Sequence, residues 1–210
     1  MDDSLLPIEI CEQVIDACHW TEWLRSSSYV VWRRTAVVCT AWLARSRVNL
    51  FHHVVLEREW HVDLLLRTVL QTPHLADLVV MLSVSPVSGA YIPFARMPLP
   101  RLLTRCAVLH LENVDWWQYP PLYVDTGLRP HWSGITKLRI RMRHRVFSAI
   151  LRFLWSLPAL QDLYLWCDSI AGMRALGSLR ARKPNACHNL KSLALEVCRD
   201  IYDKAVETSS

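Results

Sequence analysis

A repeated apolar spacing in the second half of the chain constrains its fold more than any other feature. An apolar residue is followed three positions later by a second and two positions after that by a third. The pattern occurs at Val79/Leu82/Val84, Cys106/Leu109/Leu111, Ile135/Leu138/Ile140, Leu160/Leu163/Leu165 and Leu190/Leu193/Leu195. Successive copies begin 27, 29, 25 and 30 residues apart. A recurring period of this length indicates repeated structural units, each of which packs against its neighbours.

This spacing matches the first part of the leucine-rich repeat, L-x-x-L-x-L-x-x-N/C. Cys198 takes the N/C position of the last copy, whereas Val114, Arg143 and Asp168 do not fit that position. Helical candidates lie between copies at 99–106, 146–155 and 171–181. We expect about five parallel strands backed by helices, with the L-x-L side chains pointing toward the helical layer. The alternative is an ordinary α/β domain whose strands are rich in leucine.

The first half of the chain has helical periodicity instead. Residues 5–20 predict a helix with two apolar stripes, Ile8/Cys11/Ile15/Cys18 and Leu6/Ile10/Val14/Ala17. One stripe suffices for an internal core, so the other is available to a partner. A polar spacer at 21–29 precedes a second helical stretch over 30–51, and a further helix is expected at 62–70, ending at Thr72 and Pro73. We therefore expect an α+β to α/β chain, with a helical module at 1–56 and a repeat domain at 57–210.

Residues 5–56 resemble the F-box. The resemblance rests on Leu6-Pro7-Ile8-Glu9-Ile10 with Val14 and Ile15, on Val38-Cys39-Thr40-Ala41-Trp42, and on the closing pair Leu50-Phe51. It implies a three-helix module that binds the Skp-family adaptor of a cullin-RING ubiquitin ligase, while the leucine-rich part holds a protein substrate. The adaptor-binding residues that it implies are Leu6, Pro7, Ile8, Ile10, Val14, Ile15, Val38, Cys39 and Trp42.

The resemblance implies one function, and the organisation of the chain alone allows another. The first is a substrate-recognition adaptor of an SCF-type (Skp-cullin-F-box) E3 ubiquitin ligase. The second is a leucine-rich interaction or scaffold protein without a ligase connection, whose N-terminal helices are covered by the repeats. The first function requires an exposed apolar surface that includes Leu6, Ile10, Val14 and the segment 38–42, and the second does not.

Aligning the copies predicts the solvent face of the sheet. The rows across it read Val108/Lys137/Asp162/Ser192, His110/Arg139/Tyr164/Ala194 and Glu112/Arg141/Trp166/Glu196. Because neighbouring strands lie about 4.8 Å apart, Arg139 can stack on Tyr164 and Arg141 on Trp166. The expected substrate surface comprises His110, Arg139, Arg141, Tyr164 and Trp166, together with Trp116 and Trp117 from the long connection at 115–134. The alternatives are a solvated face with internally satisfied ion pairs, and a connection that folds back as a hydrophobic lid.

Composition and motifs exclude several function classes. The formal charge is +5, and only 4 of the 24 basic residues are lysines, so arginine, the side chain of planar contacts, predominates. No nucleic-acid motif accompanies "RIRMRHR" at 139–145, and an acidic or phosphorylated peptide suits these arginines equally well. We find no phosphate loop, catalytic motif or zinc spacing, and so expect neither an enzyme nor a cofactor or metal.

The cysteines and the start of the chain bear on its location. Seven cysteines without a CxxC pair, and a start that lacks the features of a signal peptide, favour a reduced protein of the cytoplasm or nucleus. Prolines and a glycine interrupt the longest uncharged run, 78–95, so no membrane span is expected.

Overall fold

The computed structural model describes residues 7–17, 33–87, 92–93, 99–114, 132–142, 150, 153–167 and 188–197. The chain divides into two compact units, Met1–Val54 and Val55–Ser210, each of which is described by itself. Sequence analysis placed the division after residue 56.

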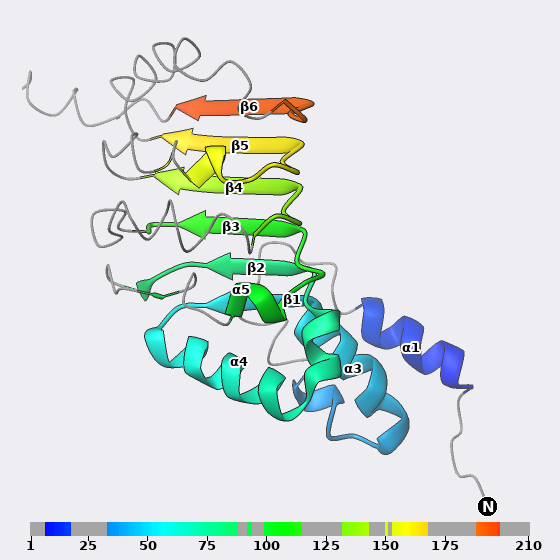
Figure 1. Ribbon diagram of the computed structural model, residues 1–210. Helices are drawn as coiled ribbons and strands as arrows, with labels where there is room; N and C mark the ends of the chain where they lie inside the picture. The colour runs from blue at the N-terminus through cyan, green and yellow to red at the C-terminus, as the bar shows by residue number, and fades with distance from the viewer. Residues whose placement is uncertain are drawn as a thin grey trace, which may run out of the picture. The chain divides into compact units, whose positions relative to one another are not determined.

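The first unit contains helix α1 (Ile8–Ala17) and helix α3 (Thr40–His52), which pack against each other (Figure 1). Helix α1 begins directly after Pro7, whose carbonyl accepts the amides of Ile10 and Cys11 at 3.1 and 3.2 Å. Proline suits this position because the first amides of a helix have no partner within it. Cys11 and Ile15 are buried, and the opposite side of the helix is exposed.

The helical stretch expected over 30–51 is interrupted in the structure. The described part of this stretch is helical at 33–35, turns at 36–38, and passes through Cys39 in an extended conformation before α3 begins at Thr40. The amides of Val37 and Val38 bond to the carbonyls of Arg34 and Thr35, each at 3.2 Å, which closes a tight turn. Two successive β-branched residues have low helix propensity, so the segment breaks there despite its apolar periodicity.

A strand that spans the boundary between the two units in sequence is followed by a helix and a 3-10 segment. Strand β1 (His53–Leu56) was not predicted, and it leads into helix α4 (Glu59–Gln71) and η1 (Pro73–Leu78). Val62, Leu65 and Val69 of α4 are buried at the spacing of one helical face. The helix ends where expected, because Thr72 leaves the helical conformation and Pro73 follows it.

A six-stranded sheet forms the rest of the described second unit. Strands β2 (Met81–Val84), β3 (Val108–Glu112), β4 (Lys137–Met142), β5 (Asp162–Cys167) and β6 (Ser192–Val197) follow β1 in sequence order. Each strand from β2 to β5 pairs in parallel with the next (Figure 1). All five expected strands are thus confirmed, and the second unit is an α/β structure.

The helical candidates between the strands are only partly described. The short helix α5 (Leu99–Leu102) occupies the first, and residues 150 and 153–155 are helical within the second. The third, 171–181, lies outside the described residues, as does Cys198. At the end of β3, Asn113 has a φ of 56°, a left-handed conformation that asparagine tolerates better than most residues.

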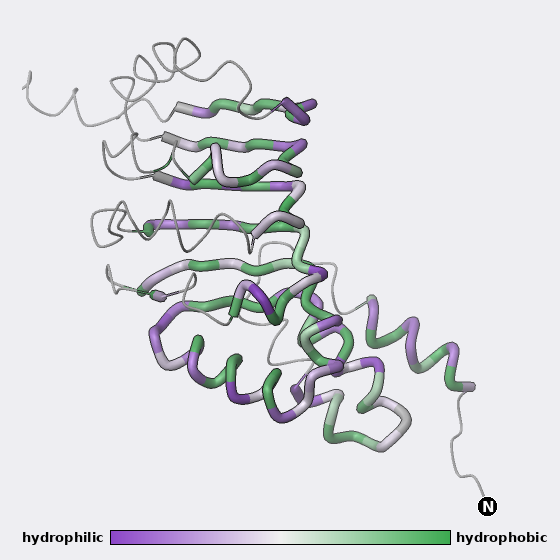
Figure 2. The backbone as a smooth tube through the Cα atoms, in the orientation of Figure 1, coloured by the Kyte–Doolittle hydropathy of each residue, from purple (hydrophilic) through white to green (hydrophobic). Residues whose placement is uncertain are grey.

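The three apolar positions of the repeated pattern form the core of the sheet. In the first four copies none of these side chains is more than 6% exposed. Figure 2 shows the corresponding alternation of apolar and polar residues along the strands. The last copy differs, because Leu193 and Leu195 of β6 are 55% and 41% exposed.

Candidate functional site

The exposed face of the sheet has the predicted register. Arg139 of β4 lies between His110 of β3 and Tyr164 of β5, and Arg141 lies between Glu112 and Trp166. The two rows continue to Ala194 and Glu196 of β6. Since side chains alternate between the two faces of a strand, these residues lie opposite the buried leucines and isoleucines. We call the residues at 110, 112, 139, 141, 164, 166 and 196 the arginine–aromatic face.

Each arginine of this face covers an aromatic ring on the neighbouring strand. The guanidinium carbon of Arg139 lies 4.7 Å from the centre of the Tyr164 ring, and that of Arg141 lies 4.2 Å from the centre of the Trp166 ring. Both arginines are exposed. Among the described residues, neither forms a salt bridge with a carboxylate. The stacked faces of the guanidinium groups are therefore occupied, while their N–H groups can bind an anionic or carbonyl-bearing ligand.

Hydrogen bonding organises the rim of the face. The Tyr164 hydroxyl donates a short hydrogen bond to Oε2 of Glu196 on β6. This hydrogen bond, more than burial or the charge of Glu196, raises the pKa of Tyr164 above its ordinary value, although Arg139 acts in the opposite direction. In the next row Nζ of Lys137 lies 3.7 Å from Oδ2 of Asp162. Two basic residues of β4, Lys137 and Arg141, thus lie in register with an acid on a neighbouring strand, Asp162 and Glu112 respectively. A surface that carries both charges can recognise an extended polar partner.

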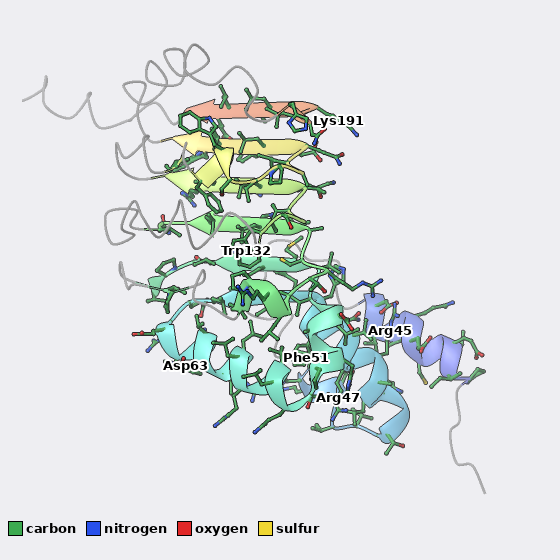
Figure 3. All side chains as sticks on the ribbon, in the orientation of Figure 1. Arg45, Arg47, Phe51, Asp63, Trp132 and Lys191 are labelled. Atoms are coloured by element: carbon green, nitrogen blue, oxygen red, sulfur yellow. The ribbon has the colours of Figure 1, made fainter. Side chains whose placement is uncertain are left out.

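Three other residues were predicted to belong to the substrate surface. His110 is half-buried on β3, and Trp116 and Trp117 lie outside the described residues. Trp132, near the end of the long connection, is buried at the level of β2 and β3 and was not singled out by sequence analysis (Figure 3). In the sequence, the only indication that Trp132 is buried is its position three residues before a copy of the repeat.

The first unit exposes the second apolar stripe of α1. Ile10 and Val14 are 41% and 45% exposed, and Pro7, Ile8, Val38 and Cys39 are also exposed. Trp42 is half-buried, and Leu6 lies outside the described residues. Ile15, which the resemblance also placed in the adaptor contact, is completely buried and serves the packing of the helix. Val37, which sequence analysis did not include, is exposed beside Val38.

An ion pair fixes which side of α1 faces outward. Nε of Arg45 on α3 donates to Oδ1 of Asp16 at 2.7 Å, and a second guanidinium nitrogen donates to Oδ2 (Figure 3). Nδ2 of Asn49 donates to the same Oδ1 at 3.0 Å. The hydrogen bond with Asp16 is the main cause of the raised pKa of Arg45. Because Val14 is two residues from Asp16, it points to the opposite side of the helix, away from this contact.

Three further observations on the described residues concern metal-binding groups, membrane-spanning helices and exposed thiols. No group of three or more histidine, cysteine, aspartate or glutamate side chains is placed to hold a metal ion within the described ranges. None of the helices described is both long and apolar enough to cross a membrane. Of the described thiols, Cys39 is exposed while Cys11 and Cys106 are buried.

No family model, curated protein or solved structure matches the chain.

Proposed function

We propose that this chain is a substrate-recognition adaptor of an SCF-type E3 ubiquitin ligase in the cytoplasm or nucleus. In this proposal the N-terminal helices form an F-box-like module that binds a Skp-family adaptor. The second unit is a short leucine-rich-repeat-like solenoid that holds a protein substrate. The chain itself supplies recognition, and the ligase assembly supplies the chemistry.

The observation that carries the proposal is the exposure of apolar residues on the outer side of α1. Cys11 and Ile15 already provide the helix with a buried side, so Ile10 and Val14 are not needed for internal packing. Burying a side chain of this size is worth roughly 1.5–3 kcal/mol in transfer terms. Part of that gain is lost to the entropy of association, but a few such residues are sufficient to anchor an interface.

The assignment to a leucine-rich solenoid rests on topology. Strands β2 to β6 lie in sequence order, pair in parallel and carry one copy of the pattern each. Successive units that contact mainly their neighbours are what a solenoid requires. Such an arrangement presents one continuous exposed face of the sheet to a partner.

For the substrate, the arginine–aromatic face supports a peptide segment with acidic or phosphorylated side chains. Tryptophan, tyrosine and arginine are the residues most enriched at the energetic centres of interfaces. Arg139 and Arg141 are two residues apart, so their backbone positions are separated by about 6.6 Å along the strand. Guanidinium groups at this spacing can each bind one anionic group of an extended segment.

The proposal is tested by adaptor binding. The parent chain, Ile10→Asp with Val14→Asp, and a control Leu64→Asp are titrated into a purified Skp-family adaptor by calorimetry. Leu64 is a suitable control because it is a helical apolar residue that is 44% exposed, close to the values for Ile10 and Val14. We expect the double variant to lose at least 100-fold in affinity and the control to change less than twofold, with circular dichroism unchanged in both.

Two results would overturn this proposal. If the parent chain does not bind the adaptor, the chain has no ligase connection and is an interaction or scaffold protein. If the double variant binds within a few fold of the parent, the exposed stripe of α1 is not the contact surface.

A further inference from the structure

Strand β6 differs from the other strands of the sheet in the exposure of its apolar side chains. It pairs with β5 over Ser192–Val197, and no described strand lies on its other side. Leu193 and Leu195 are 55% and 41% exposed, whereas the matching residues of β2 to β5 are at most 6% exposed. Within the described part of the chain, the strand is therefore an edge whose apolar side chains are less covered than those at the same positions of β2 to β5.

The outward backbone groups at this edge belong to the same two leucines and to Val197. The amide of Ser192 donates to the carbonyl of Gln161, toward β5, at 3.0 Å. Because the N–H and C=O groups of successive residues in a strand point to alternate sides, those of Leu193 and Leu195 point away from β5. An edge of this kind is a template for the addition of another strand.

β6 carries little that opposes such an addition. Its sequence, Ser-Leu-Ala-Leu-Glu-Val, contains neither proline nor lysine, and its one charged side chain, Glu196, accepts a hydrogen bond from Tyr164 on the neighbouring strand. The nearest lysine, Lys191, precedes the strand, and its Nζ lies 3.0 Å from Oε1 of Gln161 (Figure 3). That lysine is directed toward the loop before β5, so it does not block the edge.

We infer that β6 pairs in antiparallel orientation with β6 of a second copy of the chain, about a two-fold axis at Ala194. The outward backbone groups of Leu193 then face those of Leu195 in the other copy, and each such pair exchanges two N–H···O bonds. The leucine side chains of both copies fall on one face, where they cover each other. On the opposite face Ser192 lies across from Glu196, and Ala194 lies across from itself.

The strand is self-complementary in this register, which is why the occupant is a second copy. The hydroxyl of Ser192 lies opposite the carboxylate of Glu196, and the leucines lie opposite each other. Ala194, the smallest side chain, lies on the axis, so no two like charges are opposed. Of the neighbouring registers that align outward groups, the one about Leu193 leaves Leu195 without an apolar partner. The one about Leu195 places Leu193 opposite Val197 but sets each Glu196 opposite Ala194, where the carboxylate meets no donor. A two-fold contact also closes the edge of both copies at once, so assembly stops at the dimer.

Cysteine substitution tests the register. At a non-hydrogen-bonded antiparallel pair the Cα atoms are about 4.5 Å apart, within the range of about 4.4–6.8 Å that a disulfide spans. Ala194→Cys should therefore give a dimer linked between the two copies of position 194 under mild oxidation, as located by peptide mass mapping. Ser192→Cys is the matched control, because its counterpart in the other copy is offset by about 13 Å along the strand. The parent chain is oxidised in the same way, and it shows how much disulfide-linked dimer the native cysteines form by themselves.

A second measurement uses the unmodified chain. Sedimentation should show a monomer–dimer equilibrium, and Leu195→Lys should reduce the dimer fraction at least tenfold without loss of circular dichroism. A parent chain that is monomeric at all concentrations, or equal cross-linking at positions 192 and 194, would overturn the inference. So would a dimer that is unaffected by Leu195→Lys. No Skp-family adaptor is present in these experiments, so their outcome is independent of the proposed function.

Discussion

The guanidinium carbon of Arg141 lies 4.2 Å above the ring of Trp166, its register partner on the next strand of the sheet. Arg141 is exposed and Trp166 is half-buried, and a second pair of the same kind, Arg139 and Tyr164, lies beside them. Stacking on the two rings restricts the otherwise flexible arginine side chains. Such preorganisation lowers the entropic cost of binding a partner.

A double-mutant cycle on Arg141→Ala and Trp166→Ala measures this contact. Exposed cation–π pairs contribute about 0.5–1 kcal/mol, so the coupling free energy from urea unfolding should fall in that range. Neither change should lower the melting temperature strongly, because neither side chain belongs to the core. A collapse of the melting temperature would show instead that these residues serve the fold.

The strands and their register were predictable from the sequence because the pattern is short, local and repeated. Each copy specifies which residues are buried, and a parallel sheet of equivalent units then places equivalent positions side by side. Arg139 beside Tyr164 and Arg141 beside Trp166 follow from alignment alone. Strand β1 escaped prediction because its four residues directly follow the last turn of α3, so their apolar pattern merges with that of the helix.

The contacts that hold the first unit together were not predictable. Asp16 meets Arg45 across 29 residues, and the hydroxyl of Thr35 meets that of Ser46 across 11. Polar pairs of this kind depend on how two segments pack, and no local periodicity encodes them. The break before α3 was not predicted for a similar reason. The spacing of apolar residues continues through the turn, although the helical backbone hydrogen bonds do not.

The pair of Thr35 and Ser46 gives a second prediction. Their hydroxyl oxygens are 2.9 Å apart and both residues are buried. Thr35→Val removes this partner of the Ser46 hydroxyl and should cost about 1–3 kcal/mol in the free energy of unfolding. Adding Ser46→Ala removes the second polar group, so the double variant should be more stable than Thr35→Val alone. A double variant that is less stable than the single one would show that the hydroxyl of Ser46 has a separate role.

The described cysteines differ in reactivity, which gives a third prediction. Burial raises the pKa of Cys106 to about 12, while Cys39 is exposed between Val38 and Thr40. In a short pulse of iodoacetamide at pH 8, Cys39 should be modified at least tenfold faster than Cys106, as followed by peptide mass spectrometry. A Skp-family adaptor should protect Cys39 and leave Cys106 unchanged. Equal labelling of Cys39 with and without bound adaptor would remove this residue from the proposed contact.

His61 leads to a prediction of pH dependence. Its Nδ1 accepts the amide of Glu57 at 3.1 Å, and burial lowers its pKa, with a smaller opposing effect from Glu57. The unfolded chain therefore takes up this proton at a higher pH than the folded chain. The contribution of His61 to stability is fully present above its ordinary pKa of about 6.5 and is lost as the pH falls toward the lowered folded value. Nuclear magnetic resonance titration should give a midpoint below about 6.5 for His61; a midpoint above it would contradict the assignment.

The last prediction concerns the amides of β6. In dilute solution, where the chain is monomeric, the outward amides of Leu193 and Leu195 have no strand partner among the described residues, whereas Leu138 and Leu163 belong to strands paired on both sides. Amide exchange should therefore be fastest in β6 and slowest in β3 and β4. Raising the protein concentration should slow exchange at Leu193 and Leu195 and leave Leu138 unchanged, because only the edge gains bonds in the dimer. Protection of Leu193 and Leu195 equal to that of Leu138 at the lowest concentration would mean that the chain covers its own edge, and that β6 has no open side for a partner.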